Sequence, residues 1–306
     1  MGKRREVKQR LTALDEIDGI MVAMKNLALL ETRRLAAFLD TQRRAVASIG
    51  AAAGDFLSFY PQATAQTGGM QQMLLVVIGS ERGFCGDFNE TLLEPLAAAA
   101  QQGDTLLVAV GHRLEAKLQG DARISAFVEG PSVAEEVQAA LVRLVKVLGK
   151  LQQQRPQEAW RISALYHDDE SGEARLRQLL PLAEPTVRSA YSHAPLLNLE
   201  PTQFLSQLTD QYLYAALHEV FYASLMAENR KRLEHMDNAI RRMEKDEAEL
   251  RLRYNALRQE EIIEEIEIIM LSAEALSETD KPDGTVRAVV KTISTGSTRG
   301  GHHDIS

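Results

Sequence analysis

The stretch of this chain that comes nearest to a reactive site is a glycine-rich turn. It reads Ser80-Glu-Arg-Gly-Phe-Cys-Gly-Asp-Phe-Asn89 and follows an apolar run that ends at Gly79. A glycine-rich turn between a strand and a helix is where backbone amides usually bind phosphate. No Lys-Ser or Lys-Thr pair follows Gly86, so the P-loop pattern is missing, and the spacing of Gly79, Gly83 and Gly86 does not fit G-x-G-x-x-G. The residues therefore favour a structural turn over a nucleotide site.

The only cysteine of the chain, Cys85, lies in this turn. It would act as a nucleophile only with a base beside it, and His112 and His167 are the candidates for that base. A single cysteine in such a turn is more often a small apolar filler. His302 and His303 are adjacent, which is not the i, i+4 spacing that converges on one metal ion from a helix. We predict no catalytic group, no metal site and no cofactor.

The turn belongs to a middle region in which apolar runs alternate with helical patterns. Short apolar runs that end in Gly are typical of buried parallel strands. Strands are expected at 73–79, 105–111, 124–128, 160–167 and 175–182. Helices are expected at 90–101 and from 132 to about 151. Strand–helix–strand order with short links predicts an α/β fold over residues 70–200, Rossmann-like and with a mainly parallel sheet.

Two long helical stretches enclose this region. We assign residues 1–58 and 203–277 to the two helices of a long antiparallel coiled coil, and 278–306, with its Gly, Ser and Thr, to a disordered tail. At 1.5 Å per residue the second helix would reach about 110 Å and the first about 80 Å. No small domain covers such lengths. Part of the longer helix is therefore expected to project into solvent or into a cavity of another protein, as a shaft with a head at one end.

The first helix carries an imperfect heptad seam. Seven-residue spacing links Val7, Leu14, Met21, Ala28, Leu35, Ile49 and Phe56. Gln42 is the exception in that row, and Asp18, Lys25 and Thr32 interrupt a second row. A further apolar set is expected to widen the seam on one side. That set is Ile17, Ile20, Met24, Leu27 and Phe38.

The second helix carries an apolar stripe that changes its phase. As far as Leu257 the stripe advances in three- and four-residue steps. Beyond that point it shifts to Ile262, Ile266, Ile269 and Met270, which resembles a stutter. The charges on the other faces are interpreted as a solvated helix surface.

Charge favours antiparallel pairing of the two helices. The chain begins with the basic residues Lys3, Arg4, Arg5, Lys8 and Arg10. The second helix ends with the acidic residues Glu260, Glu261, Glu264, Glu265 and Glu267. Antiparallel pairing brings these opposite charges together, whereas parallel pairing would place the basic start beside the nearly uncharged stretch 202–217.

Composition excludes several classes of protein. The 306 residues are 45% apolar and carry a net charge of −8, which suits one or two folded domains and gives no reason to expect a nucleic-acid partner. No run approaches 18 apolar residues, so we expect no insertion into a membrane. A single cysteine rules out an internal disulfide. The N-terminus lacks the apolar core of a secretory signal, and a bacterial cytoplasmic protein is the simplest interpretation.

Four segments resemble, in the same order, motifs of the gamma subunit of F-type ATP synthases, over residues 3–277. Ile20-Met-Val-Ala-Met24, followed by Arg33-Arg34, is similar to I-T-K-A-M and a later basic pair. The Ser80–Asn89 turn is similar to S-D-R-G-L-C-G-x-x-N. Met236-Asp-Asn-Ala239 and Tyr254-Asn-Ala-Leu-Arg-Gln259 are similar to M-D-N-A-T and Y-N-x-x-R-Q.

The resemblance implies a rotor without bond chemistry of its own. In that family the terminal helices form a coiled coil inside a ring of three alpha and three beta subunits, which holds the nucleotide sites. The α/β domain lies beside the epsilon subunit and on the c-subunit ring of the membrane sector. Rotation of the shaft couples ion flow through the c ring to ATP synthesis or hydrolysis. The resemblance places the chain at the cytoplasmic face of a bacterial cell membrane, as a peripheral protein.

The same resemblance implies contact residues for the alpha/beta ring. Arg258 and Gln259 fall on the R-Q pair, which contacts a loop of a beta subunit. The shaft tip that runs through an apolar bearing corresponds to Ile262, Ile266, Ile269 and Met270. The acidic lower part of the beta subunits is expected beside Met24, Arg33 and Arg34.

A contact with the c ring and epsilon is implied for Glu200 and Pro201. They resemble the end of the family's Y-x-Y-E-P segment, although Leu197 and Leu199 stand where that segment has tyrosines.

Other departures favour a divergent branch, such as the alternative sodium-translocating, N-type synthases. Val22 replaces the lysine of I-T-K-A-M, and Asp87 stands at a glycine position. The run Glu260–Glu267 is more acidic than its counterpart in the family, and the tail is extra. Two other functions remain open: a coiled-coil scaffold with a regulatory α/β domain, and a small-molecule enzyme that uses the glycine-rich turn.

Overall fold

The computed structural model describes residues 2–64, 71–99, 105–155, 159–182 and 191–279. The chain divides into two compact units, one of Thr12–Glu247 and one of Met1–Leu11 with Ala248–Ser306, and each unit is considered by itself. Most of the tail assigned as disordered, residues 280–306, lies outside the described residues. Within the described ranges, no helix is both long enough and apolar enough to cross a bilayer.

Five strands form one sheet in the larger unit. They are β1 (Gln71–Ile78), β2 (Thr105–Val110), β3 (Ile124–Val128), β4 (Ala159–His167) and β5 (Ala174–Leu180), in the order β3-β2-β1-β4-β5. The first four run parallel, and β5 pairs antiparallel with β4 at the edge. The predicted α/β class with a mainly parallel sheet is confirmed.

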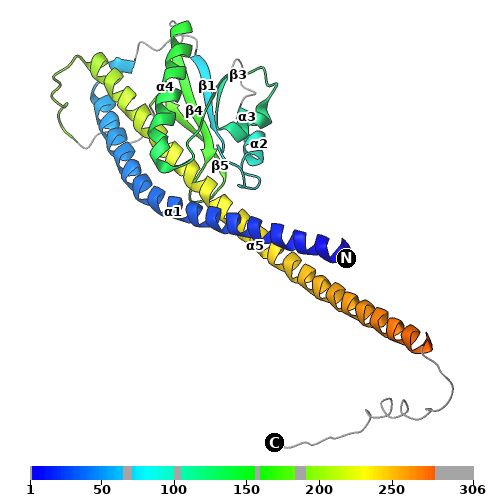
Figure 1. The fold of residues 1–306 in the computed structure, drawn as a ribbon. Helices are drawn as coiled ribbons and strands as arrows, with labels where there is room; N and C mark the ends of the chain where they lie inside the picture. Colours follow the sequence, from blue (N-terminus) through cyan, green and yellow to red (C-terminus); the bar gives the residue numbers. More distant parts are fainter. Residues whose placement is uncertain (1, 65–70, 100–104, 156–158, 183–190, 280–306) are drawn as a thin grey trace, which may run out of the picture. The chain divides into compact units, whose positions relative to one another are not determined.

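Helices cover both faces of the sheet (Figure 1). They are η2 (Glu90–Leu92), α2 (Leu93–Ala99), α3 (His112–Leu118), η3 (Ala134–Glu136) and α4 (Val137–Gln154), with the terminal helices α1 (Gly2–Phe59) and α5 (Pro201–Thr279) and the short η1 (Pro61–Thr64). Alternation along β1 separates two cores, because successive side chains point to opposite faces. Leu75 and Val77 pack with α2 and α3, whereas Leu74 and Val76 pack with α4 and α5. The helix α3 is not among the elements expected from the sequence, because seven residues are too few to show a clear helical period.

The two terminal helices pack antiparallel in the larger unit, as predicted. Contacts along α1 pair residues of rising number with residues of falling number in α5. Lys25 forms an ion pair with Asp237, and Phe56 packs on Phe204 with ring centroids 4.9 Å apart. Gln42, the exception in the apolar row, donates its Nε2 to the carbonyl oxygen of Ala215 over 3.0 Å. The polar interruption of the seam thus makes a directed contact that helps to fix the register.

One expectation about the seam is wrong. Ile17, Ile20 and Leu27 do not widen it, because these side chains are between 45% and 61% exposed. Phe38 is 49% exposed but does reach α5, since its ring stacks on Tyr222 with centroids 5.7 Å apart. A single partner helix covers only a narrow stripe of its neighbour, and α5 takes the stripe that contains Met21, Ala28 and Leu35. The side of α1 that bears the exposed set is left without a covering element in the described part of the unit.

The second terminal helix, α5, packs on the sheet as well as on α1. Its segment Ala215–Met226 is almost fully buried and joins the core of the sheet together with α4. Residues of α1, such as Leu35 and Leu39, enter the same core. A head attached at one end of a shaft is therefore an incomplete description, because α5 is itself one layer of the α/β fold.

The smaller unit contains the start of α1 and the end of α5. Here Arg4 forms an ion pair with Glu261, with Nε and Oε2 3.0 Å apart. The basic start and the acidic end therefore meet as the charge pattern predicted.

Candidate interaction surfaces and the glycine-rich turn

The glycine-rich turn is closed by its own side chains. The Oδ1 of Asn89 accepts a hydrogen bond from the backbone amide of Ser80 over 2.9 Å, and its Nδ2 donates to the Ser80 Oγ over 2.8 Å. Ser80 is fully buried. The amide that a phosphate would need is therefore already bound within the turn, which supports the structural interpretation.

Glu81 ties the turn to the next two strands. Its Oε2 accepts from the backbone amides of His112 and Gly130, over 3.0 and 2.8 Å, just after β2 and β3. Close backbone approach explains Gly111 between them. It has φ of 105°, and a Cβ there would lie 2.8 Å from the carbonyl oxygen of Gly79.

Cys85 lacks the surroundings of a nucleophile. It is buried, its Sγ donates to the Ser80 Oγ over 3.3 Å, and burial raises the pKa of its thiol. A reactive cysteine needs the opposite shift, because the thiolate is the reacting form. The two candidate bases are engaged elsewhere. The ring of His112 lies 3.5 Å from Glu115, and His167 Nε2 lies 2.8 Å from the Thr91 Oγ1.

The crevice in which an open α/β sheet usually binds ligands is filled by side chains. That crevice lies at the carboxyl ends of the strands where their order reverses, here between β1 and β4. Phe88, from the turn after β1, stacks on His167 at the end of β4, with ring centroids 3.9 Å apart, and both are buried. Burial, followed by the nearby charge of Lys231, lowers the pKa of His167 to about 4.

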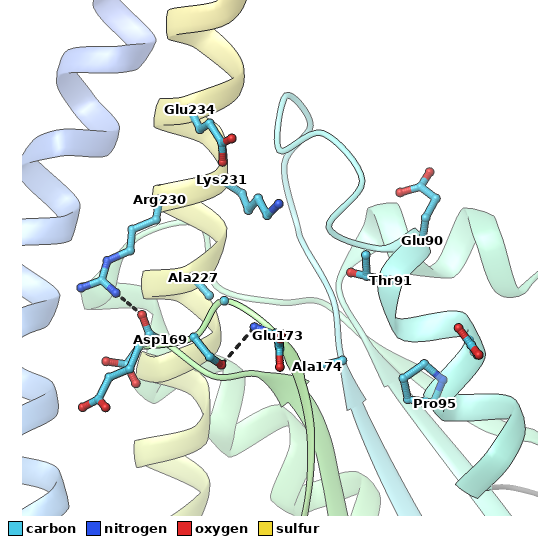
Figure 2. Close-up of a pocket in the computed structure, with 14 residues that line it drawn as sticks. Glu90, Thr91, Pro95, Asp169, Glu173, Ala174, Ala227, Arg230, Lys231 and Glu234 are labelled. Atoms are coloured by element: carbon cyan, nitrogen blue, oxygen red, sulfur yellow. Dashed lines mark hydrogen bonds between the residues drawn. The ribbon is translucent and has the colours of Figure 1, made fainter.

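A shallower cavity of about 670 Å³ lies beside this crevice (Figure 2). Its walls come from the start of α2, the β4–β5 turn and α5, and Arg230 closes one side by donating to the carbonyl oxygen of Asp169. Two cationic side chains, Arg230 and Lys231, face a larger set of carboxylates. These are Glu90, Glu94, Asp169, Glu170, Glu173 and Glu234. The excess of negative charge disfavours a phosphate-bearing ligand.

A buried charged cluster on α5 was not expected from the sequence. Glu228 and Arg232 are 3% and 5% exposed and form an ion pair. Arg232 also donates from Nη1 to the Asn229 Oδ1 over 2.8 Å and from Nε to the carbonyl oxygen of Gly83 over 3.3 Å. Burial raises the pKa of Glu228 to about 7, while Arg232 acts in the opposite direction. The i, i+4 spacing of these two residues is the signal in the sequence, but the same spacing is common on solvated helix faces.

The predicted contact residues of α1 differ in their surroundings. Met24 is half-buried beside the seam, and Arg33 and Arg34 are exposed. Arg34 is partly committed within the molecule, because its Nη1 lies 2.9 Å from the Glu135 Oε1 and 3.4 Å from the Glu31 Oε1.

In the smaller unit, the predicted contact residues of α5 are all exposed. Arg258 and Gln259 point away from the stripe that faces α1, since both are exposed whereas Leu257 is half-buried. The apolar residues beyond them are between 46% and 66% exposed. They are Ile262, Ile263, Ile266, Ile268, Ile269, Met270 and Leu271. Seven large apolar side chains on ten consecutive residues form a surface that water would disfavour.

Glu200 and Pro201 mark the start of α5. Pro201 is its first residue, a position that proline favours, and the carbonyl oxygen of Glu200 accepts from the amide of Phe204 over 2.9 Å. The Glu200 side chain is exposed, as are Leu196 and Leu199 in the loop before it.

Comparisons with known proteins agree with this architecture. A family model described as ATP synthase matches residues 3–276. The ATP synthase gamma chain of Geotalea daltonii (strain DSM 22248 / JCM 15807 / FRC-32) is 25% identical over 289 residues, which cover 90% of this chain and 99% of that relative. The gamma chain of Azobacteroides pseudotrichonymphae genomovar. CFP2 is also 25% identical, over 298 residues that cover 90% and 100%.

Solved structures show the same fold. A chain in the Euglena gracilis mitochondrial ATP synthase, OSCP/F1/c-ring, rotational state 3, superimposes with a TM-score of 0.61 at 15% identity and covers 94% of this chain and 99% of that one. A chain of the Tetrahymena thermophila mitochondrial ATP synthase central stalk and c ring gives a TM-score of 0.52 at 17% identity, with 72% and 99% covered.

Proposed function

This chain belongs to the ATP synthase family of gamma chains, and from that premise we propose that it is the rotating central shaft of an F-type ATP synthase. It acts as a non-catalytic subunit of that ion-transporting ATPase. Its partners are the alpha and beta subunits of the catalytic ring, the epsilon subunit and the c-subunit ring of the membrane sector. As part of the peripheral sector it works at the cytoplasmic face of a bacterial cell membrane.

The observation that carries the proposal is the uncovered apolar surface of α5. Between Asp237 and Ala273 no described residue of this helix is buried, yet Ile262–Leu271 contains seven exposed large apolar side chains. A monomeric protein rarely keeps such a surface in water. An apolar bearing formed by a surrounding ring would cover it from several sides, whereas one partner helix would not.

Particular residues are assigned to particular partners in this proposal. Arg258 and Gln259 contact a beta-subunit loop, and Ile262, Ile266, Ile269 and Met270 turn within the bearing. Met24, Arg33 and Arg34 face the ring at a lower level on α1. Glu200 and Pro201 contact the c ring or epsilon at the start of α5. Nine of these eleven side chains are exposed, and the other two, Met24 and Pro201, are half-buried, which is compatible with contacts to other chains.

Shaft rotation and ring conformation are coupled because the shaft makes different contacts with the ring in each orientation. A shaft that lacks threefold symmetry presents a different face to each of three equivalent ring positions. Each orientation then favours a different conformation of the neighbouring subunit, and by reciprocity a change in those subunits favours a new orientation of the shaft. The chain needs no catalytic group for this role.

Native mass spectrometry after co-expression with the alpha and beta subunits tests the proposal. We expect one copy of this chain per ring of three alpha and three beta subunits. A coiled-coil scaffold, which the exposed apolar face of α1 would also suit, predicts a stable homodimer instead. A homodimer that does not bind the ring would overturn the rotor proposal.

We further propose membership of the sodium-translocating branch, on the strength of Val22, Asp87 and the acidic run at the end of α5. ATP hydrolysis by the whole complex should then depend on sodium. Hydrolysis that is indifferent to sodium but sensitive to the proton gradient would contradict this assignment and leave the rotor role intact.

A further inference from the structure

The buried cluster of Glu228, Asn229 and Arg232 lies where α5 leaves the α/β layer. From Ala215 to Asn229 nearly every residue of the helix is buried or half-buried, and Arg232 and Met236 are the last two buried residues in its described part. A rod that carries a twisting load passes that load to its support at the last point of contact. The cluster lies close to that point, near the end of the buried segment.

The cluster contacts the glycine-rich turn. Arg232 donates to the carbonyl oxygen of Gly83, and Lys231 lies 3.5 Å from Asp87 at the far end of the turn. A Cβ on Gly86 would lie 3.6 Å from the ring of His235. Residues 228, 232 and 235 follow one face of the helix, so a single face of α5 lies along the turn.

The turn is held by several hydrogen bonds and reaches the surface at Phe84. Asn89 and Glu81 bind it to the ends of three strands, as described above. Next to Gly83, Phe84 has φ of 64° and is 56% exposed. A non-glycine residue in that conformation persists only where its surroundings hold it. Arg232 is the α5 side chain that holds the adjacent carbonyl group.

Stability alone does not account for a buried ion pair here. Taking two charges out of water costs as much as their attraction returns, and apolar replacements of similar volume are often neutral or stabilising. The planar guanidinium group of Arg232 fixes the relative geometry of its partners, because it binds Glu228, Asn229 and the Gly83 carbonyl oxygen at once.

We propose that Arg232, oriented by Glu228 and Asn229, is a positioning residue that locks the Ser80–Asn89 turn to α5 and thereby passes torque between the α/β layer and the shaft helix. The transfer of torque rests on the proposed rotor function, whereas the attachment of the turn to α5 by Arg232, here called the lock, is a property of the isolated chain.

The central test is the double substitution Glu228→Leu with Arg232→Met, which removes both charges together and leaves none buried alone. In the full-length chain we expect an unchanged or higher melting temperature. Hydrogen exchange of the amides of residues 80–89 should rise about tenfold, as for a local opening that no longer breaks a charge-assisted hydrogen bond. Arg242→Met, an exposed change on the same helix, is the matched control and should alter neither quantity.

The whole complex, reconstituted in lipid vesicles, tests the consequence. Charge translocation per ATP hydrolysed, measured with a potential-sensitive dye, should fall about two- to thirtyfold in the double variant, which is the range for residues that modulate coupling without contacting a ligand. Arg232→Lys keeps the charge but loses the fork, and should give an intermediate loss.

The outcomes separate the lock from the function. Unchanged hydrogen exchange of residues 80–89 in the double variant would overturn the proposal. Faster exchange with normal charge translocation per ATP would also overturn it. So would a loss of melting temperature that parallels the loss of charge translocation. Failure of the wild-type chain to couple in any complex would overturn the rotor function instead, while the exchange result would still report on the lock.

Discussion

Single residues in the α/β layer carry much of its specificity, and His167 is an example. It closes the crevice between β1 and β4 by stacking on Phe88 and bonding to Thr91, and burial lowers its pKa to about 4. An exposed histidine titrates near 6.5, so the unfolded chain takes up a proton at pH values where the folded chain does not.

This difference predicts a specific loss of stability in acid. The contribution of His167 is fully present above pH 6.5 and is lost as the pH falls toward 4, by about 3 kcal/mol in all. His167→Gln should therefore show a smaller fall in the free energy of unfolding over this range, measured by urea denaturation at several pH values. His193→Gln, at an exposed position, should leave the fall unchanged. Equal pH dependence in wild type and His167→Gln would contradict the assignment.

Glu31 shows how one side chain joins two elements. It is buried on α1, and its Oε2 accepts from the backbone amide of Ala134 at the start of η3 over 3.1 Å. Replacing it by alanine leaves that amide without its acceptor, which should cost about 1–3 kcal/mol in the free energy of unfolding. Glu16→Ala, at an exposed position of the same helix, should be nearly neutral. Chemical denaturation of both variants checks this, and equal effects would mean that the carboxylate of Glu31 contributes nothing specific.

At the scale of elements, the terminal helices have different faces for different neighbours. The stripe of α1 with Leu35 and Leu39 packs into the core shared with the sheet, whereas the face with Ile17 and Ile20 stays exposed. The sequence pattern shows both sets as apolar and does not say which of them α5 covers.

The division between these faces predicts unequal effects of the same substitution. Leu35→Ala should destabilise the chain by about 2–5 kcal/mol, because it opens a cavity in a fully buried position. Leu30→Ala, five residues earlier on the same helix and 53% exposed, should change the free energy of unfolding by less than about 0.5 kcal/mol. Thermal or urea unfolding of the full chain measures both. Comparable losses would show that the exposed face of α1 is packed in solution.

At the scale of the whole molecule, the chain has a compact layered part and a helix surface without cover. The layered part explains how the chain folds, and the uncovered helix surface explains why it needs partners. Substitutions in the second should therefore affect coupling more than stability.

Arg258→Ala and Gln259→Ala test this expectation directly. Both side chains are exposed, so the melting temperature of the isolated chain should not change. ATP-driven ion transport by the assembled complex should fall, because these groups are proposed to contact a beta-subunit loop. Arg253→Ala, exposed on the same helix, is the control and should leave transport unaltered. If melting temperature and transport fell together, the two residues would be structural.

The sequence by itself determined most of the elements, though not the short helix α3, and the antiparallel pairing of the two terminal helices. Apolar runs that end in glycine, heptad spacing and opposite charges at the two ends are local or one-dimensional signals, and they sufficed for the α/β class, the long helices and their antiparallel arrangement. The tertiary structure decided which of several equally apolar faces is buried, that α5 serves the sheet as well as α1, and that Glu228 and Arg232 lie in the interior. Those outcomes depend on which distant segments meet, and no spacing along one helix contains that information.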